Sequence, residues 1–457
     1  MIGLTLYDYL LFPLYLVAVF YIFKKLRQRY SENKNLYFYF TWGFRIKIFI
    51  IIVYTLLSHF VIRGDAVDLY FGEGKRFAQY VKDDYRNIDL LFTKAGKTTD
   101  ELASDDEKGY LAVESNYMVV KVCILLCFVS FSCFSVINLI IGFIAFLGSW
   151  QLYLFFLKQY PKLHKEFAFA CLGIPTVLFW SAGISKDTIC LTSLAVFTKC
   201  FYDISKTRKK MLRNIILIII AVYLIYQIKS YILMSYLPFF LLFLIISKIN
   251  ETQIPIIRYA LKLSIPLLLT GIVVYIIANS EDLFKDYSSD KILENISGKQ
   301  SAFNAQSQRE AGSYFTLGDF DGSISGLVNM APKAVIATFF RPFIWESRNL
   351  VMILSSLEAM ALFIFTVYVL IKGRFIHFFS ILLKNSTVFY CLAFSFFFAI
   401  FVGISTYNFG SLVRYKIPCI PFYVSSLFII NYLRQQRVKA ADTQQAIAKT
   451  GEISPVG

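Results

Sequence analysis

Long apolar runs separated by short polar segments occupy most of the 457-residue chain. A membrane-spanning helix needs about 20 predominantly apolar residues. Strands of alternating polarity are absent from the sequence, which disfavours a β-barrel. The pattern therefore predicts an all-α integral membrane protein of about 11 transmembrane helices, with residues 1–432 as a single polytopic domain. The predicted spans are 7–23, 46–62, 136–157, 167–182, 188–203, 214–229, 231–247, 259–278, 350–371, 386–404 and 415–432.

Basic residues after the first span set the predicted orientation, because lysine and arginine are enriched on the cytoplasmic side of membrane proteins. The residues concerned are Lys24, Lys25, Arg27 and Arg29. This predicts a multi-pass protein of the cell's inner (plasma) membrane, with the N-terminus outside and the C-terminus in the cytoplasm. Two larger loops, 63–117 and 279–349, are then extracytoplasmic, and residues 433–457 form a polar cytoplasmic tail that we expect to be disordered.

Residues 118–157 leave the number of crossings open. Their 40 residues are enough for two spans, or for a half-inserted helix at Met118–Ser132 followed by a single span. The single crossing agrees with the basic residues further along the chain, so the predicted topology uses it. In the second large loop we expect a helix at Val328–Phe340.

Composition excludes several classes of protein. The chain is 57% hydrophobic and has a formal net charge of +16, but most of its basic residues flank apolar segments, and no basic stripe with interleaved aromatics indicates a nucleic-acid partner. The eight cysteines form no CxxC pair and the three histidines are far apart, so no residue is assigned to a metal. Neither a Walker loop nor a GxGxxG fingerprint is present, which argues against a nucleotide-dependent enzyme or pump.

Acidic residues open the first large loop. Asp65 follows Gly64 just after a predicted span, and Asp68 comes three residues later, on the same face if the segment is helical. A carboxylate there can take the proton from an attacking hydroxyl. The alternative is a solvated helix start, where aspartate accepts backbone N–H bonds. The sequence leaves both open.

Basic residues form the second constellation. They are Arg309, Arg341, Arg348, Arg414 and Lys416. On an outer face these residues are exceptions to the enrichment of lysine and arginine on the cytoplasmic side. Arginine binds phosphate oxygens through two parallel hydrogen bonds. We assign phosphate binding to Arg341, Arg414, Lys416 and Arg309. The alternative is snorkelling to the head groups, or local pairing such as Arg341 with Glu346.

Three further charged residues lie near or within predicted spans. Ionisable groups in spans are rare and tend to face the protein interior or water. Glu358 lies about two turns into its helix, where it can orient Arg341 or Arg414. Lys186 and Asp187 are adjacent at a predicted interface, where a local pair is the simpler interpretation. All three are given supporting roles.

A basic run at Arg45 and Lys47 precedes one helix, and the following loop opens with Gly64-Asp65 and Tyr70. Three further stretches are Pro175–Asp187, Phe340-Arg341-Pro342-Phe343 and Arg414-Tyr415-Lys416-Ile417-Pro418. Together these stretches resemble the GT-C superfamily of membrane glycosyltransferases, which use polyprenyl-phosphate-linked sugars. The resemblance covers roughly residues 45–432 in layout but only these stretches in motif, and an extra helix precedes it.

The resemblance implies a glycosyltransferase of cell-envelope polysaccharide biosynthesis. It would move a sugar from a polyprenyl-phosphate-linked donor to an extracytoplasmic glycan acceptor, with the catalytic acid of the family at Asp65 or Asp68. In that scheme Asp65 is the base, and Asp68 assists it or binds a divalent cation. Two other functions remain open from the sequence: an O-antigen or exopolysaccharide type of polymerase, and a lipid or polysaccharide transporter, which would carry charged residues deep in several spans.

Overall fold

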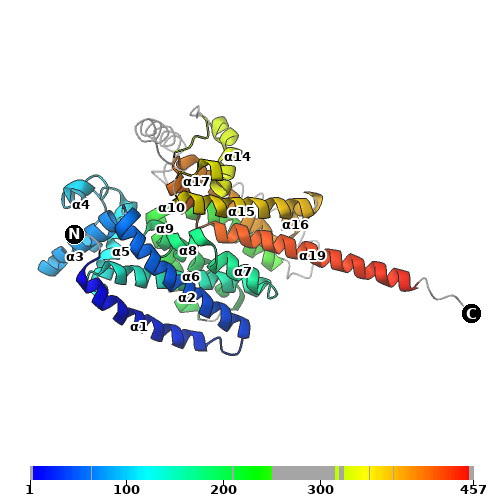
Figure 1. Cartoon of the computed structure of the whole chain (residues 1–457), viewed down its shortest axis with the longest axis horizontal. Helices are drawn as coiled ribbons and strands as arrows, with labels where there is room; N and C mark the ends of the chain where they lie inside the picture. The colour runs from blue at the N-terminus through cyan, green and yellow to red at the C-terminus, as the bar shows by residue number, and fades with distance from the viewer. Residues whose placement is uncertain are drawn as a thin grey trace, which may run out of the picture. The chain divides into compact units, whose positions relative to one another are not determined.

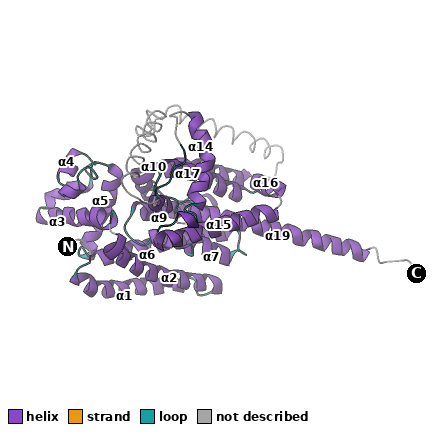
Figure 2. Cartoon of the chain, turned by 45° about the horizontal axis from the view of Figure 1, so that its top comes forward, coloured by secondary structure: helices purple, strands orange, loops and turns teal. Residues whose placement is uncertain are grey.

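The computed structural model describes residues 4–62, 64–207, 210–249, 314–318, 324–348, 350–373 and 375–451. Every regular element in these ranges is a helix, and a single isolated bridge joins Tyr314 to Asn408 (Figure 2). The predicted all-α class is confirmed for this part of the chain. Arg309 and the predicted span 259–278 lie outside the described residues.

The chain packs as two compact units, whereas the apolar pattern predicts one polytopic domain. The first unit is Met1–Met234 together with Val413–Pro418, and the second is Ser235–Leu412 together with Cys419–Gly457. The short segment 413–418 therefore belongs to a unit whose other residues precede it by almost 180 positions.

In the first unit, α6 (Phe134–Gln159) packs against several other helices (Figure 1). Among them are α1 (Leu6–Gln28), α2 (Lys34–Leu57), α7 (His164–Leu172) and α9 (Lys186–Thr207). The remaining elements are η1 (Ser58–Ile62), η2 (Ala66–Glu73), α3 (Gly74–Asp83), η3 (Tyr85–Leu91), α4 (Lys97–Glu101), η4 (Asp105–Glu107), α5 (Glu114–Ser130), α8 (Pro175–Trp180) and the first part of α10 (Met211–Ile249).

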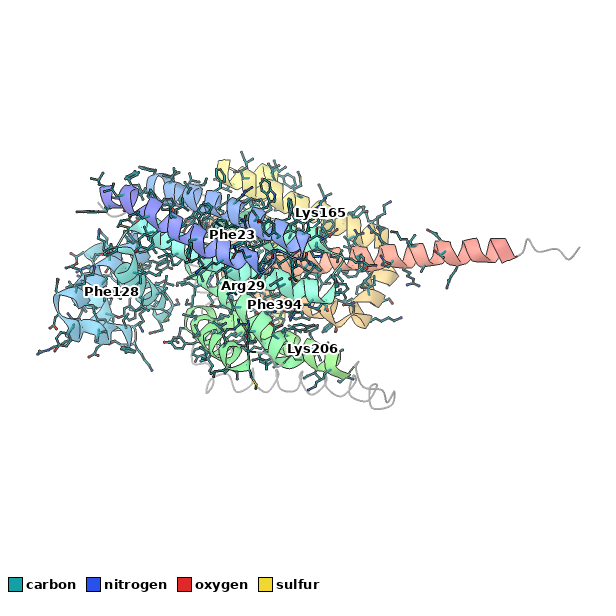
Figure 3. The ribbon with its side chains drawn as sticks, turned by 90° about the horizontal axis from the view of Figure 1, so that it is seen from below. Phe23, Arg29, Phe128, Lys165, Lys206 and Phe394 are labelled. Carbon is teal, nitrogen blue, oxygen red and sulfur yellow. The ribbon has the colours of Figure 1, made fainter. Side chains whose placement is uncertain are left out.

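Aromatic and polar contacts fix α1 in this unit. The ring of Phe23 stacks on that of Phe44 with centroids 3.9 Å apart, and Figure 3 shows Phe23 on α1 together with the basic Arg29 at its end. At the other end, the buried Asp8 carboxylate accepts hydrogen bonds from the backbone N–H and hydroxyl of Thr5 and from the same two groups of Ser135. One aspartate therefore satisfies donors at the N-termini of both α1 and α6.

The second unit contains the rest of α10, α14 (Ile324–Phe340), η5 (Ile344–Glu346), α15 (Leu350–Gly373), α16 (Phe375–Lys384), α17 (Ser386–Ser405), most of α18 (Phe409–Tyr415) and α19 (Ile420–Gly451). The expected helix at Val328–Phe340 is confirmed as part of α14. α14 packs against α17, and a Cβ at Gly403 would lie only 2.5 Å from the carbonyl oxygen of Ala334. The predicted tail is helical as far as Gly451, because it is rich in alanine, glutamine and lysine, which favour helix.

Six described helices are long and apolar enough to cross a membrane, which indicates a multi-pass membrane protein in a lipid bilayer. They are Leu6–Gln28, Lys34–Ile62, Phe134–Gln159, Met211–Ile249, Met352–Gly373 and Ser386–Ser405. A seventh is obtained if α18 and the apolar part of α19, bent by 64°, count as one span. The predicted 11 spans are not confirmed.

Three differences explain most of the discrepancy in the described part of the chain. The predicted spans 214–229 and 231–247 are one helix, α10, broken at Lys229. The predicted span 167–182 is divided between the short helices α7 and α8. α9 carries five charged residues, including Lys186 and Asp187 at its start, and is not among the candidate spans. Residues 118–157 form the 17-residue α5 and the candidate span α6, which agrees with a single crossing.

Candidate functional site

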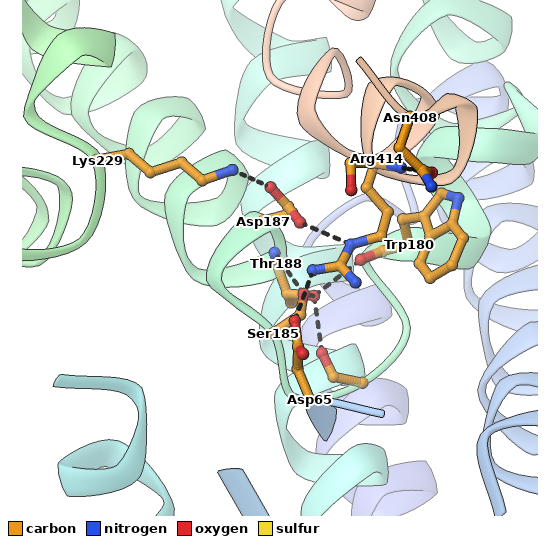
Figure 4. A network of polar contacts seen from close by, with 10 residues as sticks. Asp65, Trp180, Ser185, Asp187, Thr188, Lys229, Asn408 and Arg414 are labelled. Carbon is orange, nitrogen blue, oxygen red and sulfur yellow. Dashed lines mark hydrogen bonds and ion pairs between the residues drawn. The ribbon is translucent and has the colours of Figure 1, made fainter. Parts of the chain in front are cut away.

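Asp65 lies in a turn between two π-helices at the end of the second candidate span. Gly64 adopts a φ of +83°, which is left-handed and favours glycine, and it separates η1 from η2. π-helical turns occur frequently at functional sites. The Asp65 side chain is 52% exposed, and its Oδ2 accepts a hydrogen bond of 3.3 Å from Nη2 of Arg414 (Figure 4). Two residues 349 positions apart are therefore in contact.

Arg414 is held by a second carboxylate and by aromatic rings. Its Nε donates to Oδ2 of Asp187 at 3.4 Å. Its guanidinium carbon lies 5.5 Å from the centre of the Trp180 ring and 5.9 Å from that of Tyr415. These contacts restrict the guanidinium plane, and each ring face attracts the positive charge. The side chain is 22% exposed, so it is partly accessible to solvent.

Asp187 is the buried centre of the network. Its side chain is 1% exposed, and its second oxygen accepts from Nζ of Lys229 at 2.5 Å. Lys229 is 7% exposed and its Nζ lies 3.8 Å from the centre of the Tyr415 ring. α10 has non-helical backbone angles at Lys229 (φ −149°, ψ 72°), so the break in the helix occurs at the residue that reaches Asp187. A buried charge requires such a partner.

The turn between α8 and α9 fixes Asp187 at the start of α9. The buried ammonium of Lys47 donates to the carbonyl oxygens of Leu178 at 3.0 Å and Ser181 at 2.8 Å. The side-chain oxygen of Asn138 accepts from the backbone N–H of Ile184 at 3.1 Å. Lys47 on α2, as a donor, and Asn138 on α6, as an acceptor, therefore anchor both sides of the turn.

Close packing inside this turn leaves no room for a side chain at its centre. A Cβ at Gly183 would lie 2.1 Å from a ring carbon of Tyr54 and 2.6 Å from Oδ1 of Asn138. The hydroxyl of Thr188 donates to the carbonyl oxygen of Gly183 at 2.7 Å. The position of Asp187 is therefore determined by packing as well as by hydrogen bonds.

Lys186 and Tyr70 complete the surroundings of Asp65. Lys186 donates from Nζ to the hydroxyl of Ser115 at 2.8 Å. Burial lowers the pKa of Lys186 to about 8, and the nearby charge of Lys229 acts in the same direction. Burial raises the pKa of Tyr70 well above its usual value, and the charge of Asp65 adds to this shift. Tyr70 is therefore a neutral hydroxyl next to the carboxylate.

Of the residues predicted to form the site, the structure brings Asp65, Asp187 and Arg414 into direct contact. Asp68 follows Asp65 by three residues, and its Oδ2 accepts from the backbone N–H of Gly64 at 3.2 Å, as the helix-start alternative expects. Lys416 belongs to the same unit and is buried.

The other predicted residues belong to the second unit. Arg341 forms an ion pair with Glu346, with Nε 3.0 Å from Oε1, and its guanidinium lies 4.7 Å from the Phe315 ring. This is the local pairing that the sequence left as the alternative. Glu358 lies half-buried on α15, and Arg348 is exposed. Neither Arg341 nor Glu358 belongs to the unit that holds Asp65.

Sequence reasoning missed Lys229, Trp180 and Tyr415. Lys229 stands between two apolar stretches, where the predicted spans 214–229 and 231–247 meet. Its position in the middle of an otherwise apolar run of almost 40 residues was the available signal, because such a charge requires a buried partner. In the described part of the chain, no group of three or more His, Cys, Asp or Glu side chains could hold a metal ion.

Comparison with known proteins finds no matching family model, no similar curated protein and no similar solved structure.

Proposed function

We propose that the protein is a membrane glycosyltransferase that moves a sugar from a polyprenyl-phosphate-linked donor to an extracytoplasmic acceptor. The observation that carries the proposal is the contact between a solvent-accessible carboxylate, Asp65, and a rigidly held guanidinium, Arg414, next to a candidate span. A transferase of this kind needs a base for the acceptor and a cation for the leaving phosphate, both within reach of the lipid-linked donor.

The reaction balances with these two groups. The acceptor hydroxyl oxygen attacks the anomeric carbon of the donor sugar, and the bond between that carbon and the phosphate oxygen breaks. The proton of the hydroxyl goes to Asp65. Polyprenyl phosphate leaves with the bonding electron pair on its phosphate oxygen, and Arg414 stabilises the growing charge of that phosphate.

Local structure supports these roles. Asp65 is the exposed member of the network, whereas Asp187 is buried, so only Asp65 can reach an acceptor from solvent. Arg414 is fixed at Nε by Asp187, which leaves the Nη edge toward Asp65 for the phosphate. A guanidinium that is oriented before the substrate arrives needs little reorganisation in the transition state.

The test is the substitution Asp65→Asn, which keeps the shape of the side chain and removes the base. Release of radiolabelled sugar from a panel of polyprenyl-phosphate-linked donors should fall by roughly two to four decades. Asp106→Asn, at an exposed aspartate of the same loop, is the matched control and should transfer normally. Full activity of Asp65→Asn at normal protein level would reject Asp65 as the base.

Transport of a lipid-linked or polymeric anion is the second candidate. The observation that favours it is the buried pair of Lys229 and Asp187 at a break in the candidate span α10, since broken helices and buried charges mark many transport pathways. The two functions differ in their need for a sealed membrane. Sugar transfer continues in detergent micelles, whereas transport requires closed vesicles.

A further inference from the structure

Arg414 bridges two carboxylates that differ greatly in exposure. Asp187 is 1% exposed and also binds Lys229, whereas Asp65 is 52% exposed. The contact between Nε and Asp187 belongs to a buried ion pair, which is difficult to break without a replacement charge. The contact between Nη2 and Asp65 is partly solvated, and such ion pairs are weak. The two ends of the bridge are therefore unequal.

We propose that Asp65 occupies the position of a ligand phosphate on Arg414, and that the phosphate of the substrate displaces it. This inference rests on the proposed function, because the displaced carboxylate is the base of the transfer reaction. Arginine binds a phosphate through two parallel hydrogen bonds. The donor phosphate is a diester with a single negative charge, and as the sugar is transferred it becomes a monoester, which carries more negative charge than one carboxylate. The exchange therefore favours the phosphate, while Asp187, Trp180 and Tyr415 keep the guanidinium in place.

Competition predicts an unusual result for Asp65→Asn: it should bind a phosphate more tightly than the unmodified protein does. Asp65→Asn removes the partly exposed ion pair with Arg414 and the negative charge of Asp65. This loss should increase the affinity for phosphate by about two- to fivefold. Asp68→Asn is the matched control, because it removes the same charge three residues further along the chain. The Asp68 carboxylate accepts a hydrogen bond from the backbone N–H of Gly64. The effect of Asp68→Asn should be smaller than about twofold. Arg414→Lys lacks the planar fork and should bind at least about tenfold more weakly.

The experiment is calorimetric titration of the purified full-length protein in micelles with dodecyl phosphate, and separately with inorganic phosphate. Tighter binding of dodecyl phosphate assigns the site to a lipid-linked phosphate, and equal binding assigns it to the free ion. Thermal unfolding of each variant checks folding, and Asp65→Ser replaces Asp65→Asn if the latter is unstable.

The outcomes separate the two proposals. Binding that is lost in Arg414→Lys but unchanged or weakened in Asp65→Asn overturns displacement and leaves the phosphate role of Arg414 standing. Equal binding by Arg414→Lys and the unmodified protein, or no binding by either, rejects the phosphate role itself and the displacement with it. Tightening by Asp68→Asn as large as by Asp65→Asn also overturns displacement, because the effect would then be one of general charge.

Discussion

The ion pair of Lys229 and Asp187 should behave as a coupled unit in stability measurements. Asp187→Asn removes the carboxylate from two cations at once and leaves the Lys229 ammonium buried. Lys229→Met keeps most of the apolar stem, and Asp187 still has the Nε of Arg414 at 3.4 Å. The two single substitutions are therefore not equivalent, although they affect the same pair.

The magnitudes follow from burial. Breaking a buried pair by removing one partner costs about 3–5 kcal/mol, which we expect for Asp187→Asn. Lys229→Met should cost less, about 1–3 kcal/mol, because the remaining charge keeps a partner. The double variant no longer holds an unpaired ammonium. It should therefore be more stable than Asp187→Asn alone by about 1–2 kcal/mol, even though it carries an additional substitution.

The assay is unfolding of the purified protein in mixed micelles by added sodium dodecyl sulfate, followed by tryptophan fluorescence. Lys158→Met is the matched control: its Nζ lies 2.5 Å from Asp203, the same distance as in the buried pair, but the lysine is 43% exposed. It should cost about 1 kcal/mol or less. Additive losses in the double variant, within about 0.5 kcal/mol, would refute the coupling.

Two other predictions concern the turns and the titration of the site. Gly183→Ala should destabilise the fold by about 1–3 kcal/mol or more, because the new Cβ has no room next to Tyr54. Gly64→Asn should cost less than about 1 kcal/mol, because the space around Gly64 is open and asparagine tolerates a positive φ. Equal losses of stability in the same unfolding assay would contradict this difference. Lys186 has its pKa lowered to about 8 from 10.5, so the unfolded chain binds more protons between these values, and the contribution of this lysine to stability rises as the pH increases through that window. Lys186→Met should flatten the rise measured from pH 8 to 10.5, and an unchanged slope would exclude Lys186 as its source.

The sequence predicts the helices, and it selects Asp65 and Arg414 as candidate site residues, better than it predicts the path of the chain. Both residues stand just outside apolar segments whose ends the positive-inside rule places on one side, and the structure shows the contact. The rule depends only on charge and apolar length, which are local properties of the sequence. It therefore identifies which residues can meet.

The break in α10 depends on tertiary contacts and was not predictable in this way. A lysine between two apolar stretches is compatible with a hairpin of two helices and also with one broken helix. The partner of Lys229 decides between them, and this partner, Asp187, lies 42 residues earlier. Arg341 is a different case, because Glu346, five residues away, pairs with it locally, and the sequence offers this pairing as one of two alternatives.

Charge alternates along the network while exposure increases at its outer members, from Lys229 (7%) and Asp187 (1%) to Arg414 (22%) and Asp65 (52%). The inner two charges lose much on desolvation and recover it from each other and, for Asp187, also from Arg414, so they are expected to determine stability. The outer two retain contact with water, so they can exchange partners at low cost. Substitutions at Lys229 should thus change the unfolding free energy far more than at Asp65, and those at Asp65 should change phosphate affinity and sugar transfer at nearly constant stability. This separation distinguishes a site built for exchange of an anion from a uniformly structural salt-bridge network, in which both properties would change together.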